Sequence, residues 1–154
     1  MAEETVYQKS LREQGELRAM NEKLIEFLER PRPEAAAPEA HEWACSLNEQ
    51  LVQLHQKISL HFREEDGAGI LSRLAEHHPH AAEKLEGLRG EHERIHDDLQ
   101  QIVSASMNYA AAKTPDNPKL RERTRGLLDR IAQHESRETA LILDLISTDV
   151  GDGH

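Results

Sequence analysis

Three pairs of ionisable residues constrain the fold of this chain more than any other feature. The two members of each pair are four positions apart, and the pairs are His61 with Glu65, His92 with His96, and His134 with Glu138. Residues four apart lie on nearly the same face of an α-helix, so both side chains of a pair can point at one object. Each pair interrupts an apolar stripe of helical periodicity. The chain is therefore expected to place six ionisable groups inside a helical protein.

Prolines and apolar repeats divide the chain into helices. Apolar residues at spacings of three and four predict helices at about 4–30, 39–76, 79–112 and 118–147, followed by a tail over 148–154. The stretches PRPEAAAP and TPDNP separate helices, because proline cannot continue a helix. Gly67 and Gly69 predict a bulge or kink shortly after Glu65. Short connections and the lack of strand alternation predict one domain over 1–154, an all-α, up-down-up-down four-helix bundle.

Composition agrees with helices and narrows the partners. Only five of the 154 residues are aromatic, so leucine, isoleucine and alanine must build the core. The net charge of −10 argues against a nucleic-acid partner, because phosphate binding needs clustered lysine and arginine. No run approaches the roughly 18 apolar residues of a membrane span, and the lone Cys45 excludes an internal disulfide. We therefore expect a cytoplasmic location and no nucleic-acid or membrane partner.

A metal centre accounts for ionisable groups on apolar faces. Burying six of them without partners would cost several kcal/mol each. A bundle whose total stability is about 5–15 kcal/mol could not absorb that cost. Four imidazoles and two carboxylates form a donor set suited to a pair of iron or manganese ions inside a helix bundle.

Two other interpretations remain open. His92, Glu93 and His96 form an H-E-x-x-H, the zinc signature of many metalloproteases, in which Glu93 would be the general base. The longer metzincin pattern is absent, and no predicted strand is available to line a peptide cleft. The second alternative is a metal-poor structural or interaction bundle that retains part of the site.

Three segments give the chain a resemblance to the hemerythrin-like (HHE cation-binding) domains over essentially its full length. They are LHFREED, LRGEHERIH and IAQHESRE, one around each pair. The resemblance implies a four-helix bundle with a non-haem di-iron centre, two Fe ions joined by a bridging oxo or hydroxo group. By position it implies the ligands, in which His92, His96 and His134 bind one iron, His61 binds the other, and Glu65 and Glu138 bridge both.

The resemblance also implies a function. Such a protein binds, senses or stores oxygen, or handles peroxide, nitric oxide or iron itself. It is a ligand-binding metalloprotein, and a peroxide or oxidase side activity stays open. The family usually draws a further histidine from the first helix, but residues 1–30 contain none. Glu13, Gln14 and Glu16 stand roughly at that position, and the register does not choose among them. We therefore expect the second iron to be the weaker or more open of the two.

Overall fold

Four long helices form the molecule. The computed structural model describes residues 4–67 and 69–152, with side chains described up to residue 147. The long helices are α1 (Val6–Glu29), α2 (Glu39–Asp66), α4 (Ala82–Ala111) and α5 (Pro118–Asp152). A short helix α3 (Ile70–His77) and a 3₁₀ turn η1 (Pro79–Ala81) connect α2 to α4. Within the described residues there is no strand, so the prediction of an all-helical bundle is confirmed.

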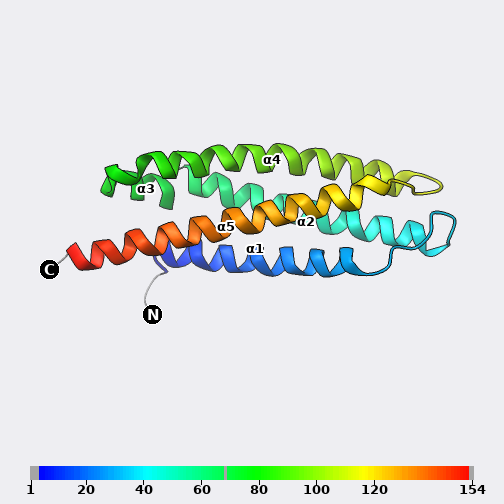
Figure 1. The fold of residues 1–154 in the computed structure, drawn as a ribbon, viewed down its shortest axis with the longest axis horizontal. Coiled ribbons are helices and arrows are strands. Elements are labelled where there is room, and N and C mark those ends of the chain that lie inside the picture. The colour runs from blue at the N-terminus through cyan, green and yellow to red at the C-terminus, as the bar shows by residue number, and fades with distance from the viewer. Residues whose placement is uncertain (1–3, 68, 153–154) are drawn as a thin grey trace.

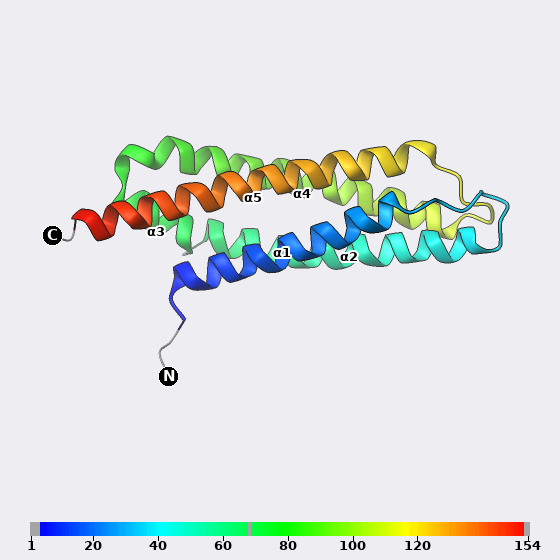
Figure 2. The same ribbon diagram turned by 60° about the horizontal axis from the view of Figure 1, so that its bottom comes forward.

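The long helices alternate in direction and enclose one interior. Figures 1 and 2 show an elongated bundle in which α1 begins and α5 ends at the same end of the molecule. Each long helix packs against two others, since α1 and α4 both contact α2 and α5. This ring of contacts is typical of a four-helix bundle with short connections. Among the described residues, no helix has a segment long and apolar enough to cross a membrane.

Local chemistry fixes where the helices begin. Thr5 and Gln8 form a capping box at the start of α1, in which each side chain accepts a hydrogen bond from the backbone N–H of the other residue. Asn117 accepts a bond from the backbone N–H of Leu120 at the start of α5. Pro118 is the first residue of that helix, a position where a missing N–H has no cost.

The second predicted helix is interrupted at the position where a kink was predicted. The helix expected over 39–76 is divided, because α2 ends at Asp66 and α3 begins at Ile70. A side chain at Gly69 would overlap the carbonyl oxygen of Glu64, so the backbone can turn here only with glycine. At the other end of the chain, α5 continues to Asp152, beyond the predicted end at 147.

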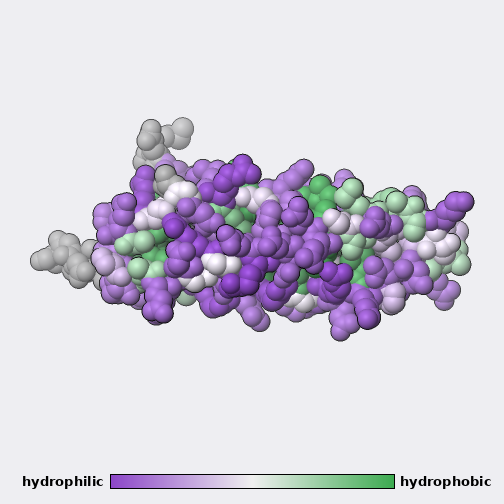
Figure 3. Space-filling view, turned by 90° about the horizontal axis from the view of Figure 1, so that it is seen from above, coloured by the Kyte–Doolittle hydropathy of each residue, from purple (hydrophilic) through white to green (hydrophobic). Residues whose placement is uncertain are grey.

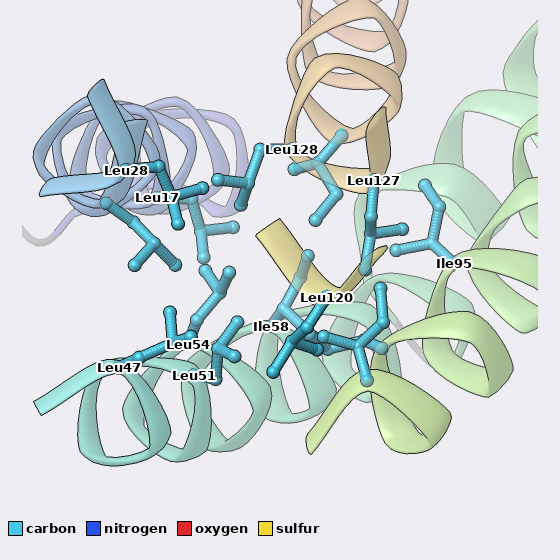
Figure 4. Packing of buried hydrophobic residues seen from close by; sticks show 14 of the residues in the cluster. Leu17, Leu28, Leu47, Leu51, Leu54, Ile58, Ile95, Leu120, Leu127 and Leu128 are labelled. Atoms are coloured by element: carbon cyan, nitrogen blue, oxygen red, sulfur yellow. The ribbon is translucent and has the colours of Figure 1, made fainter. Parts of the chain in front are cut away.

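Two apolar clusters form the core. The larger one fills the half of the bundle that holds the α1–α2 and α4–α5 connections, and Figure 4 shows its leucine and isoleucine side chains pointing from several helices toward a shared interior. The smaller cluster joins α3 to the start of α4 and the end of α5, through Leu71, Leu74, Leu85 and Ile142. Hydrophilic residues cover most of the face shown in Figure 3.

The larger cluster allows a direct test of the packing on α2. Leu47 is 0% exposed, whereas Leu60 on the same helix is 52% exposed. Leu47→Ala should lower the free energy of unfolding by about 2–5 kcal/mol, because it removes buried apolar surface and leaves a cavity. Leu60→Ala should change it by no more than about 0.5 kcal/mol. Urea unfolding of the metal-free protein, followed by far-ultraviolet circular dichroism, measures both, and equal losses would contradict the described packing.

Candidate metal centre

A layer of buried polar side chains separates the two apolar clusters. All four long helices contribute to it, and its members are Ser10, Gln14, His61, Glu65, His92, His134, Glu135 and Glu138. On α5, for example, the layer lies between Ile131 of the larger cluster and Ile142 of the smaller one. Five of the six residues expected to bind metal therefore lie together, sealed above and below by apolar side chains.

His96 is the expected ligand that the structure does not bring to this layer. Its side chain is 39% exposed, and its ring lies beside that of His55, with 5.1 Å between the ring centroids. The buried stripe of α4 passes from His92 to Ile95, so the next residue faces the surface. His92 and His96 are thus divided between interior and surface. Neither a three-imidazole set with His134 nor the H-E-x-x-H zinc pair is assembled in the described geometry.

A carboxylate contacts the Nδ1 atom of each buried imidazole. The Nδ1 atoms lie 2.8 Å from Glu13 for His61, 2.8 Å from Asp66 for His92, and 2.6 Å from Glu91 for His134. A carboxylate at this position accepts the Nδ1–H hydrogen and fixes the ring orientation, which directs the lone pair of a neutral imidazole to Nε2. Metal-binding histidines are commonly held in this way. Asp66 and Glu91 were not part of the expected ligand set, whereas Glu13 was one of three candidates for a first-helix ligand and lies instead at Nδ1 of His61.

The Nε2 atoms lie close to two glutamates. His61 Nε2 lies 3.0 Å from Glu65 Oε1, and His134 Nε2 lies 3.0 Å from Glu138 Oε2. His92 lies between the two carboxylates, with its Nε2 atom 3.2 Å from Glu138 Oε2 and 3.7 Å from Glu65 Oε1. The ligand atoms of His92, His134 and Glu138 all lie within 4.8 Å of one another, close enough to share one ion.

The ring of Phe62 holds His92 on its remaining side. The two rings stack with centroids 3.9 Å apart and planes 7° from parallel, and the edge of His134 approaches the same phenyl ring. Together with Asp66 at Nδ1, this contact leaves the His92 ring little freedom to rotate. The imidazole is therefore positioned before any ligand arrives.

Crowding of charge perturbs the protonation of the layer. Burial raises the pKa of Glu65 well above its usual range, and repulsion from Glu138 raises it further. The pKa of Glu138 is lowered despite burial, because Glu65, His134 and His92 all hydrogen-bond to its ionised form. Burial disfavours the charged form of His92, yet hydrogen bonds to Asp66 and Glu138 raise its pKa to about 10. Protons here balance the carboxylate charge that a bound cation would balance instead.

The three first-helix residues left open by the sequence have separate roles. Glu13 binds Nδ1 of His61, as described, and Glu16 pairs at the surface with Arg12 and Lys57. Gln14 is buried in the layer and donates from Nε2 to Glu138 Oε1 over 2.8 Å. Of the three, Glu13 contacts an imidazole, and it does so at Nδ1 of His61 rather than at Nε2.

Glu135 belongs to the layer although the sequence motifs did not include it. It is 3% exposed, and burial raises the pKa of its carboxyl group to about 8, with a further contribution from the charge of Glu138. One of its oxygens lies within 4.8 Å of ligand atoms of His61 and Glu138. A signal was present in the sequence, because Ile131, Glu135 and Ile142 follow the alternating three- and four-residue spacing of a core stripe together with position 138.

Comparison with known proteins adds no identification. No protein-family model matches the chain, and neither the curated proteins nor the solved structures give a significant match. The resemblance to hemerythrin-like domains therefore rests on the three sequence segments, and the buried layer is the main evidence on function.

Proposed function

We propose that this chain is a non-haem di-iron protein that binds, senses or stores oxygen, peroxide, nitric oxide or iron in the buried layer. One observation carries the proposal: His61, His92 and His134 are each held at Nδ1 by a carboxylate and face two buried glutamates through Nε2. Imidazole and carboxylate donors suit iron and manganese, whereas thiolate ligands would favour other metals. The one cysteine, Cys45, is exposed on α2.

The surroundings of the layer suit a small ligand better than a large substrate. A surface cavity of about 340 Å³ lies between α1 and the α2–α3 break, and Ser10 and Glu65 form part of its lining. The hydroxyl of Ser10 donates to Glu65 Oε2 over 3.2 Å, so this side of the cavity ends at a residue of the layer. Bound iron would supply a redox-active centre there, while the two apolar clusters limit access of water from either end.

Metal analysis after anaerobic reconstitution with ferrous iron tests the proposal. We expect close to two irons per chain and, in the oxidised protein, a near-ultraviolet charge-transfer band that shifts on addition of azide. Glu93→Gln is the matched control, because Glu93 is exposed beside His92 and should not affect the metal content. Less than half an equivalent of any metal would favour the metal-poor interaction bundle. A peptidase activity lost in Glu93→Gln would favour the zinc hydrolase.

A further inference from the structure

Four buried ligand atoms of the layer lack a hydrogen-bond partner among the described residues. They are Nε2 of His61, Oε1 of Glu65 and both carboxylate oxygens of Glu135. His61 Nε2 and Glu65 Oε1 are 3.0 Å apart, yet they are not aligned as donor and acceptor. A buried carboxylate with no partner is costly, and such groups normally pair with a cation or bind a metal ion.

Two of these residues, His61 and Glu135, lie close enough to each other and to Glu138 to share one ion. One ligand atom from each of His61, Glu135 and Glu138 lies within 4.8 Å of the other two, and Glu65 Oε1 is beside the imidazole. Glu13 holds Nδ1 of His61, which leaves Nε2 free to act as a ligand. We infer that His61 and Glu135 bind a second cation, distinct from the ion on His92 and His134. This inference rests on the proposed function and names the ligands of its second metal.

Gln14 on the first helix is poorly placed to be a ligand of this second cation. Its amide nitrogen donates to Glu138, and its amide oxygen accepts from the hydroxyl of Thr139. Both polar ends of the side chain are therefore used in positioning α5. The carboxylate of Glu135 has no such engagement with described residues, so α5 supplies the donor that was expected from α1.

The two ligand sets differ in hardness. His92 and His134 give the first ion two imidazoles, whereas the second ion receives one imidazole from His61 and a carboxylate from Glu135. Glu65 and Glu138 lie close enough to be shared. Carboxylate oxygen favours hard ions such as manganous or ferric, and imidazole suits ferrous, zinc and copper ions. We therefore expect the preference for zinc over manganous ion to be smaller at the second site than at the first.

Glu135→Gln tests this assignment with little change in side-chain volume. Titrated with manganous or ferrous ion under anaerobic conditions, the variant should bind close to one ion per chain where the unsubstituted protein binds two. The affinity for the remaining ion should change by less than about tenfold. Glu122→Gln is the matched control, because it removes an exposed carboxylate from the same helix and should leave two ions bound.

The outcomes separate this inference from the proposed function. Two ions in Glu135→Gln at unchanged affinity, or one ion in both proteins, would overturn the role of Glu135 while leaving metal binding intact. No ion in either protein would overturn both. If Glu135→Gln does not fold, anomalous diffraction from manganese-loaded crystals of the unsubstituted protein decides. It should show one manganese bonded to Glu135 and His61, and a manganese site without Glu135 would exclude the assignment.

Discussion

The double variant His134→Leu/Glu138→Leu should lose the stabilisation that ferrous iron confers. Both side chains are fully buried on α5 and face the other ligands. In the metal-free variant Gln14 and His92 lose their acceptor on Glu138, so the effect of iron is measured for each protein against its own metal-free form. A ligand that binds only the folded chain stabilises it by about 4 kcal/mol at a thousand times its Kd. The variant forfeits that gain.

Thermal unfolding with and without ferrous iron, under anaerobic conditions, measures the effect. For a chain of this size, about 1 kcal/mol corresponds to roughly 2–4 °C in Tm, so the iron-dependent rise of about 8–16 °C should disappear. His96→Leu is the control, because its imidazole lies at the surface beside His55 and should leave the rise intact. Loss of the rise in His96→Leu would make His96 a ligand after all. A rise that persists in the double variant would place the ions elsewhere.

The helices were predictable because their signals are local. Proline stops, the cap at Asn117 and the apolar stripes each act within a few residues of their position, and so do the glycines near Glu65. The full separation of α2 from α3 was less predictable than the presence of a kink. Gly69 allows a sharp turn, but whether the chain kinks or starts a new helix depends on α3 packing its leucines against α4 and α5.

The layer was predictable only in part, because helix rotation is not a local property. Residues at i+3 and i+4 lie on opposite sides of the face defined by residue i, separated by about 100°. Which of the two faces the interior depends on how neighbouring helices pack. On α4 the inward position is Ile95 rather than His96. On α5 the packing buries Glu135 together with His134 and Glu138. Glu135 is not part of the pair spaced by four, yet its carboxylate lies in the interior of the bundle.

Metal-free protein should lose stability as the pH rises from about 6.5 to 8. His92 has a pKa of about 10 in the folded chain against 6.5 ordinarily, and Glu135 has about 8 against 4.5. Both groups bind protons more tightly when folded, so their contribution is full below the ordinary values and disappears as pH rises through the folded ones. For each extra proton that the folded chain holds, the free energy of unfolding falls by about 1.4 kcal/mol for every unit rise in pH. The lowered pKa of Glu138 affects the free energy of unfolding only in more acidic solution.

Bound metal should reverse this dependence, because a cation replaces the protons of the layer. Metal binding releases protons, so affinity for manganous ion rises with pH over the interval in which the metal-free protein weakens. Urea unfolding at pH 6, 7 and 8, with chelator or with saturating manganous ion, should give a falling series without metal and a flat or rising one with it. Parallel series would mean that the ions bind away from His92 and Glu135, since only occupation of this layer exchanges their protons for metal.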